Sequence, residues 1–307
     1  MTQRIVLWFN DRHCVNPWLA YVRSSIGPGV DNGDKLNFLE FCGSSITAAN
    51  EKRGLPLFIH LRLAKIRQDS HMKIGILKAD NVRPELVDNF GEYPEMFREI
   101  LLAADPNTEI ISYEIMSGEY PGDIDEVDGY VITGSKLSVY DDVEWIRQLG
   151  HFIQRLHRAK KKLVGICFGH QMVAHFLGGR TEKSDNGWGV GIHRSKFTEA
   201  APKYGEAGSS FNLVCSHQDQ VIEPAPSSVV LASSDFCPFS MLQIEDHILT
   251  LQGHPEFKRE FSRSLLELRR EVFGESCYEQ GMESLEQTTD AYQVGKWMTD
   301  FISSDAA

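Results

Sequence analysis

The stretch "VGICFGHQMVAH", Val164–His175, decides the fold. It begins in an apolar run of strand-like character and turns at Cys167 into a pattern with the helical period. Gly165 and Gly169 flank the cysteine, and small residues are what a crowded turn from a strand into a helix requires. We therefore expect the thiol at the N-terminus of a helix whose apolar stripe comprises Met172, Val173, Phe176 and Leu177.

The segments around this turn alternate between strand and helix. Upstream lie KIGIL, a helix around PEMFREILLAA, then EIISYEI, GYVIT and a second helix around EWIRQLGHFIQRLHRAK. Between Arg180 and Leu251 short strands follow, among them FNLVCS, SVVLAS, SMLQI and HILTLQ, and helical patterns resume at KREFSRSLLELRREVF. This alternation predicts an α/β fold with a largely parallel central sheet flanked by helices.

The helix before the quoted stretch has the clearest pattern. It is predicted over Asp142–Lys160, and Asp141 and Asp142 are its expected N-terminal cap. Its predicted apolar stripe comprises Trp145, Leu149, Phe152, Ile153 and Leu156.

Three regions differ in character along the 307 residues. Residues 1–71 lack sustained periodicity and predict a poorly ordered N-terminal extension, which an upstream assignment of the start codon could explain. Residues 72–270 carry the alternating pattern and predict one domain. Residues 271–307 predict a C-terminal helical extension.

Composition restricts the class of partner and the compartment. A formal net charge of −12 disfavours nucleic acid and anionic membranes and favours a small molecule or a protein. The six cysteines form no CxxC pair, which argues against a zinc site and a disulfide framework. The early run IVLWF is too short for a signal peptide, so we expect a cytoplasmic protein.

Two interpretations of Cys167 are open, a catalytic nucleophile and a small buried residue of the core. At a helix N-terminus the dipole and the unpaired N–H groups favour the nucleophilic thiolate, and the N–H of Phe168 points to where an oxyanion would form. A cysteine taken at random is more often a small buried apolar residue. The Gly-x-Cys-x-Gly setting favours the nucleophile.

A base and its orienting group are both present in "LQGHPEF", Leu251–Phe257. His254 follows another predicted strand, and Pro255 fixes the chain between it and Glu256. The carboxylate can then hold one ring nitrogen while the other faces the sulfur, which is the logic of a catalytic triad. Alone, such a tripeptide is weak evidence, but it becomes specific beside Cys167.

Together, "GICFGHQ" and the downstream "GHPE" resemble the class I glutamine amidotransferases, which have a flavodoxin-like fold. The resemblance covers Met72 to Arg270. Within the family, the chain is similar to the amidotransferase domain of GMP synthase and to the γ-glutamyl peptidases. The resemblance implies that Cys167 attacks the side-chain amide of glutamine, forming a γ-glutamyl thioester. By the same resemblance, His254 assists the thiol and then activates water, and Glu256 orients His254.

Two more stretches are similar to substrate-side elements of that family. "VITGSK" is similar to the loop whose Ser135 N–H completes the oxyanion hole beside Phe168, although the usual Gly-Gly-Pro reads Gly-Ser-Lys here. "VCSHQD" is similar to the segment that holds the glutamine backbone. The implied substrate contacts are Gly134, Gln171, Ser216 and His217. Neither a metal nor a cofactor is implied, and we expect Lys136 and Tyr140 to face the substrate mouth.

Several functions agree with these features. About 37 residues follow Arg270, so no acceptor domain is expected, and a stand-alone hydrolase of glutamine or another γ-glutamyl compound ranks first. The alternatives are an ammonia-supplying subunit of a separate synthetase, a non-catalytic binding module with the same fold, and a cysteine peptidase of another α/β family. The sequence does not identify the γ-glutamyl substrate.

Overall fold

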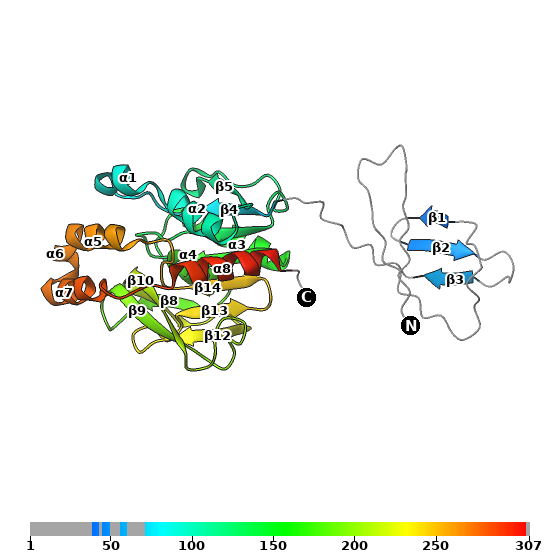
Figure 1. Cartoon of the computed structure of the whole chain (residues 1–307). Coiled ribbons are helices and arrows are strands. Elements are labelled where there is room, and N and C mark those ends of the chain that lie inside the picture. The colour runs from blue at the N-terminus through cyan, green and yellow to red at the C-terminus, as the bar shows by residue number, and fades with distance from the viewer. Residues whose placement is uncertain (1–38, 43–44, 50–55, 60–70, 305–307) are drawn as a thin grey trace. The chain divides into compact units, whose positions relative to one another are not determined.

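The computed structural model describes residues 39–42, 45–49, 56–59 and 71–304 (Figure 1). The chain divides into two units, Met1–Ser70 and His71–Ala307. The described part of the first is an antiparallel sheet of β1 (Leu39–Cys42), β2 (Ser45–Ala49) and β3 (Pro56–Ile59). Sequence patterning predicts none of these strands. Most of the expected N-terminal extension lies outside the described residues and stays a prediction.

The second unit is built on a nine-stranded sheet. Its parallel strands are β4 (Lys73–Leu77), β5 (Glu109–Tyr113), β6 (Gly129–Ile132), β7 (Lys162–Ile166) and β14 (Ile248–Leu251). Its antiparallel strands are β9 (Gly189–Phe197), β10 (Ser210–His217), β12 (Ser228–Ser233) and β13 (Met241–Ile244). The spatial order is β10-β9-β12-β13-β14-β7-β6-β4-β5, and β8 (Arg180–Lys183) pairs separately with β11 (Asp219–Glu223). The predicted sheet is confirmed, with an antiparallel region at one side.

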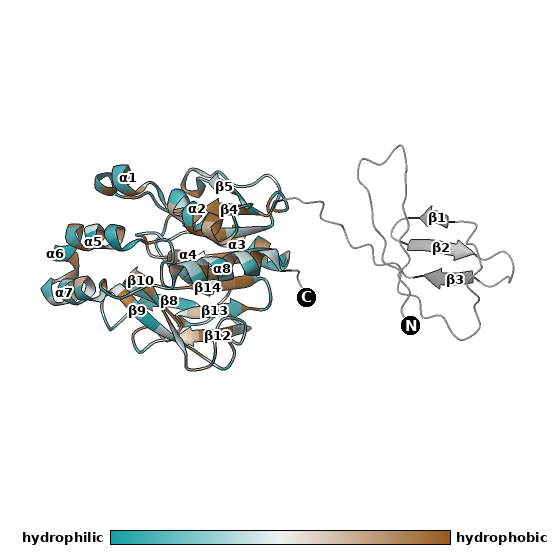
Figure 2. Cartoon of the chain, in the orientation of Figure 1, coloured by the Kyte–Doolittle hydropathy of each residue, from teal (hydrophilic) through white to brown (hydrophobic). Residues whose placement is uncertain are grey.

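Helices cover both faces of the parallel strands (Figure 1). One face packs against α2 (Tyr93–Ala104) and α8 (Ala291–Ser303), whose Phe97, Leu101 and Met298 share a core with strand side chains. The other face packs against α3 (Glu144–Arg158) and α4 (Phe168–Phe176). Figure 2 shows the apolar character of β4, whose last four residues are buried. The three-layer α/β architecture is the one expected from the alternating pattern.

A group of shorter helices packs beside β9 and β10. It comprises α1 (Pro84–Phe90), α5 (Arg259–Leu268), α6 (Arg270–Phe273) and α7 (Glu275–Ser284), and the 3₁₀ turn Ile115–Ser117 lies elsewhere, beside α3. An edge-to-face contact of Phe90 with Phe261, at 5.4 Å between ring centroids, joins α1 to α5. These helices therefore have a small apolar core of their own beside the end of the sheet that carries the site.

Helix α3 begins later than predicted. Its N-cap is Val143, and no side chain caps it. The carboxylate of Asp141 instead accepts a 2.9 Å hydrogen bond from the N–H of Ser138, within the preceding turn. The expected aspartate cap is therefore wrong, because the turn already uses that carboxylate. Ile146 belongs to the buried stripe, whereas Trp145 is only partly buried.

The C-terminal segment is helical and packs tightly on the sheet. In α8, the Trp297 ring makes edge contacts with Phe197 and Phe211 at centroid distances of 5.6 and 5.5 Å. Gly295 brings the backbone of α8 close to α2, since a Cβ there would lie 3.1 Å from the carbonyl oxygen of Ile100. Within the described residues, no helix has the length and apolar character that crossing a membrane needs.

Candidate active site

Cys167 lies between β7 and α4, where the chain turns abruptly. It is the N-cap residue of α4 and has φ 51° and ψ −100°, a backbone conformation that non-glycine residues rarely adopt. Its side chain is almost buried, with 4% of the residue exposed. Strain of this kind is characteristic of functional turns. The predicted position of the thiol at a helix N-terminus agrees with the structure.

The glycines around Cys167 are required by close backbone packing. A Cβ on Gly165 would lie 2.6 Å from the carbonyl oxygen of Gly169, and one on Gly169 would lie 2.7 Å from that of Ile132. Real Cβ atoms essentially never approach other heavy atoms this closely. The Gly-x-Cys-x-Gly pattern is therefore a consequence of how tightly α4 packs on β7 and β6.

His254 comes to Cys167 because of strand order. β14 pairs with β7 in parallel, so the residues after each strand meet at the same edge of the sheet. The N–H of His254 donates a 2.7 Å hydrogen bond to the carbonyl of Val214 in β10, which fixes its backbone. A Cβ placed on Gly134 would lie 2.8 Å from Cε1 of His254 and 3.8 Å from Cβ of Cys167. Both side chains therefore adjoin Gly134.

Glu256 holds the histidine ring. Its Oε1 lies 2.7 Å from Nδ1 of His254, and the Glu256 side chain is fully buried. The Phe257 ring stacks on the His254 ring, with 3.9 Å between centroids and 8° between planes. The carboxylate and the aromatic face thus fix both the tautomer and the plane of the imidazole.

The charges around His254 favour its protonated form. Burial alone would lower its pKa, but the charges of Glu256 and Cys167, and hydrogen bonds to both, raise the pKa to about 10. A protonated imidazole beside a thiol stabilises the thiolate, which is the reactive form of cysteine. The imidazole of His254 is therefore a charged hydrogen-bond donor held beside Cys167.

The loop after β6 carries the expected second oxyanion donor, Ser135. Thr133 fastens its start, because its hydroxyl accepts from the N–H of Ala79 at 2.9 Å and donates to the Gly134 carbonyl at 3.1 Å. Lys136 binds Asp80 through its backbone N–H and its ammonium. The lysine expected at the substrate mouth therefore forms an ion pair with the end of β4.

The structure gives the predicted substrate contacts different environments. Gln171 is buried, and its Nε2 donates to the carbonyl of Asp219 at 2.7 Å and to Oε1 of Gln252 at 3.1 Å. His217 is buried as well, and burial lowers its pKa to about 3. Ser216 is more accessible and accepts a long hydrogen bond from Arg269. Of these polar side chains, Ser216 is the one that faces a charged group.

Three residues that sequence reasoning missed surround this site. Asp80, 5% exposed, follows β4 at the same edge of the sheet. Tyr93 stacks on Phe257, and its pKa is raised by burial and then by the charges of Asp80, Glu256 and Cys167. Arg269 ends α5. Of the three, only Asp80 could have been found from the local sequence, because it is a polar residue just beyond a buried strand.

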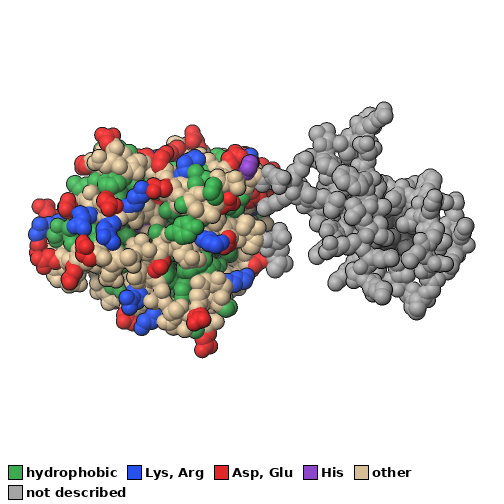
Figure 3. Space-filling model, in the orientation of Figure 1, with side chains coloured by type: hydrophobic (Ala, Val, Ile, Leu, Met, Phe, Trp, Pro, Cys, Tyr) green, Lys and Arg blue, Asp and Glu red, His purple; other side chains and the backbone are tan. Residues whose placement is uncertain are grey.

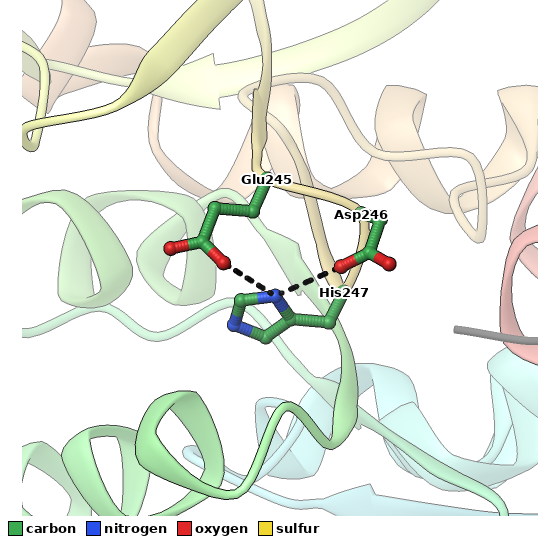
Figure 4. A group of neighbouring side chains, drawn as sticks. All are labelled: Glu245, Asp246 and His247. Atoms are coloured by element: carbon green, nitrogen blue, oxygen red, sulfur yellow. Dashed lines mark ion pairs between the residues drawn. The ribbon is translucent and has the colours of Figure 1, made fainter. Parts of the chain in front are cut away.

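One cluster in the described residues has the composition of a metal site, and it lies away from this region. Glu245, Asp246 and His247 form the turn before β14, at the strand end opposite His254 (Figure 4). Both carboxylates approach Nδ1 of His247, at 3.8 and 3.5 Å. Lys160 already pairs with Glu245, and the other ring nitrogen of His247 lies 2.9 Å from His157. These contacts give the turn a structural role.

Fold and site together define an α/β protein that mounts a cysteine on a strand-to-helix turn beside a His-Glu pair. The family model "Glutamine amidotransferase class-I" matches residues 85–268, more than half of the sequence. The chain belongs to this family.

Curated relatives and solved structures agree with this assignment. Gamma-glutamyl peptidase 3 of Arabidopsis thaliana is 35% identical over 156 residues, covering 48% of this chain and 63% of the relative. The matched region is thus less than two thirds of the peptidase. A glutamine amidotransferase-like protein of Schizosaccharomyces pombe is 30% identical over 231 residues, covering 71% of this chain and 93% of the relative. A Thermotoga maritima glutamine amidotransferase shares the fold, with TM-score 0.61, 16% identity and coverage of 76% of this chain and 100% of the other.

Proposed function

We propose that this protein hydrolyses the γ-glutamyl amide bond of glutamine or of another γ-glutamyl compound, with Cys167 as nucleophile. One observation carries the proposal: the thiol lies on a strained turn beside His254, whose Nδ1 is 2.7 Å from a buried carboxylate oxygen of Glu256. A nucleophile, a base and an orienting group are the components that acyl transfer requires.

In the first half-reaction, the thiolate of Cys167 attacks the γ-carbonyl carbon and a C–S bond forms. The charge that develops on the oxygen is bound by the N–H groups of Phe168 and Ser135. The N–H of Phe168 belongs to the first turn of α4, where helix N–H groups have no partner within the helix. His254 gives its proton to the leaving nitrogen, the C–N bond breaks, and a γ-glutamyl thioester remains.

In the second half-reaction, neutral His254 takes a proton from water while the oxygen attacks the thioester carbon. The C–S bond breaks, free glutamate leaves, and the pair of thiolate and imidazolium is restored. Glu256 keeps Nδ1 of His254 protonated throughout, so that Nε2 exchanges the proton. Each step uses groups of this chain and water.

The names of the relatives suggest two uses for this chemistry. The γ-glutamyl peptidases favour a stand-alone hydrolase of γ-glutamyl peptides, which we rank first. The relatives named glutamine amidotransferase-like leave the supply of ammonia to a separate synthetase as the second candidate. A cytoplasmic location remains part of the proposal.

The test measures release of ammonia or amine from glutamine, glutathione and γ-glutamyl amines by the purified full chain. Cys167→Ala should abolish turnover. Cys277→Ala is the matched control, because Cys277 is a half-buried thiol in α7 whose pKa burial raises. A diazoketone analogue of glutamine should label Cys167 and leave the control thiol unmodified.

Hydrolysis of glutathione faster than glutamine supports the first candidate. Weak glutaminase activity that rises when a synthetase is added supports the second, since a partner that closes the site commits the substrate. Turnover that persists in Cys167→Ala excludes the proposed mechanism in both cases.

A further inference from the structure

Arg269 ends α5 in an unusual environment. Its guanidinium lies over the rings of Trp188 and Phe273, 4.7 Å from each centroid. One nitrogen donates a 3.4 Å hydrogen bond to the hydroxyl of Ser216 in β10. Two aromatic faces therefore fix the plane of the guanidinium, and most of its five N–H donors stay unused by this contact.

No carboxylate pairs with Arg269 among the residues that the structure describes. A second cation, Arg83 at the start of α1, is close enough for the two charges to repel, and its side chain likewise makes no ion pair in the described region. Other described arginines without an ion pair include Arg98 and Arg259, whose guanidinium groups donate to backbone carbonyls instead. A clamp that only fastened α5 to its neighbours would explain the aromatic contacts, but it would leave most N–H donors of Arg269 without an acceptor.

Arg269 contacts the strand that holds the backbone of His254. Ser216 lies two residues beyond Val214, whose carbonyl accepts the backbone N–H of His254. Burial and then Arg83 lower the pKa of Arg269, while the charges of Tyr93 and Cys167 raise it. Figure 3 shows basic side chains over α5, with acidic side chains among them.

We propose that Arg269, together with Arg83 at the start of α1, binds a carboxylate of the substrate and so selects anionic γ-glutamyl compounds. The inference rests on the proposed function and extends it to the substrate class. A planar guanidinium with free donors matches a carboxylate through two parallel hydrogen bonds. In a chain of net charge −12, unpaired cations near the nucleophile give an anionic substrate a local site of attraction.

Two carboxylates of a γ-glutamyl peptide offer this chemistry, the α-carboxylate of the γ-glutamyl group and the carboxylate of the leaving amino acid. Three substrates separate them: glutathione has both, glutamine has the first alone, and glutaminamide has neither. Arg269→Gln should raise KM about ten- to hundredfold, the range of a charge-assisted hydrogen bond, and change kcat little. Arg83→Gln should raise KM less than Arg269→Gln does.

If KM rises for both glutathione and glutamine, Arg269 binds the α-carboxylate of the γ-glutamyl group. If KM rises for glutathione alone, Arg269 binds the carboxylate of the leaving amino acid. Glutaminamide turnover should be unaffected in either case. The matched control is Arg263→Gln, which removes an exposed arginine from the same helix, paired with Glu286, and should leave all three substrates unchanged. Equal KM values for Arg269→Gln and the wild type would overturn the proposal.

Alkylation of Cys167 tests the cation pair without any turnover. Iodoacetate carries a carboxylate and iodoacetamide does not, so their relative rates at Cys167, followed by mass spectrometry, report the local attraction for an anion. Arg269→Gln should lower the ratio of iodoacetate to iodoacetamide rates several-fold, and an unchanged ratio would contradict the inference. Because alkylation needs no hydrolysis, this measurement stands even if the proposed reaction fails, and melting temperature checks that the variant is folded.

Discussion

Asp80 binds Lys136 twice, through a 2.8 Å hydrogen bond from the backbone N–H and a 3.0 Å contact with the ammonium. The two parts differ in strength. The Asp80 side chain is 8% exposed, whereas that of Lys136 is 72% exposed, so water screens the ammonium. The bond from the backbone N–H therefore does most to fix the loop, and it holds the residue next to Ser135.

Asp80→Ala should lower kcat about ten- to a hundredfold with a smaller change in KM, because the Ser135 N–H would lose its fixed position. One oxyanion donor is worth about a hundredfold or more, and a displaced donor loses part of that. Steady-state hydrolysis of glutamine and glutathione measures the effect.

Lys136→Met and Asp80→Asn serve as controls for this prediction. The first removes the screened ammonium but keeps the backbone N–H, and the second keeps an acceptor for that N–H. The kcat of both variants should stay within a few-fold of the wild-type value. If Lys136→Met lowered kcat as much as Asp80→Ala does, the ammonium of Lys136, and not its backbone N–H, would be what positions the loop.

Gly134→Ala should reduce kcat/KM by about a hundredfold or more while the fold persists. The added methyl group would lie 2.8 Å from Cε1 of His254, so the ring must move away from Cys167, and small displacements of catalytic groups are costly. Gly122→Ala is the control, since nothing lies within 4 Å of a Cβ there. Equal activity of the two variants, with equal melting temperatures, would refute the close approach of Gly134 and His254.

Glu256→Gln should change how stability depends on pH. The folded state raises the pKa of His254 from 6.5 to about 10, so its contribution is fully present below pH 6.5 and is lost as the pH rises toward 10. Gln removes the charge that helps to raise this pKa. The wild type should exceed the variant by about 1–3 kcal/mol at pH 6 and by less at pH 10, measured by urea unfolding. A difference that grows with pH would contradict the assignment.

Local patterns predicted the position of Cys167 on its turn better than the surroundings of that turn. The turn at Cys167 and the His-Pro-Glu segment could be read from the sequence because the close packing of glycines and the chain direction after a strand are local constraints. Strand order places β14 beside β7. Local patterns do not predict this neighbour, and only the resemblance to the family implied it. Of the antiparallel strands, β10, β12 and β13 were located from the sequence, whereas β9 and the arrangement of all four were not.

The residues that sequence reasoning missed depend on tertiary contacts. Arg269 gains its aromatic environment from Trp188, 81 positions earlier in the chain, and Phe273, and no local period connects Arg269 with Ser216. The motif position of Gln171 implies a contact with substrate, which stays a prediction, and the structure adds hydrogen bonds from its amide nitrogen to the protein. Burial and hydrogen bonding decide such roles, and neither can be read from a motif.

The two ends of the chain should respond differently to deletion. A chain that begins at Met72 should keep its activity and melting temperature, because residues 71–307 form one unit. A chain that ends at Ser284 should not fold. It loses the α8 side chains that pack in the core of the sheet, namely Val294, Trp297, Met298, Phe301 and Ile302.

At about 1.5–3 kcal/mol for each buried side chain, the loss of α8 amounts to about 8–15 kcal/mol, as much as the whole stability of a typical domain. Circular dichroism melting and glutathione hydrolysis check both truncations. Cooperative unfolding of the chain that ends at Ser284 would show that α8 only covers a sheet that is stable without it. Loss of the fold in the chain that begins at Met72 would make residues 1–71 part of the structural core.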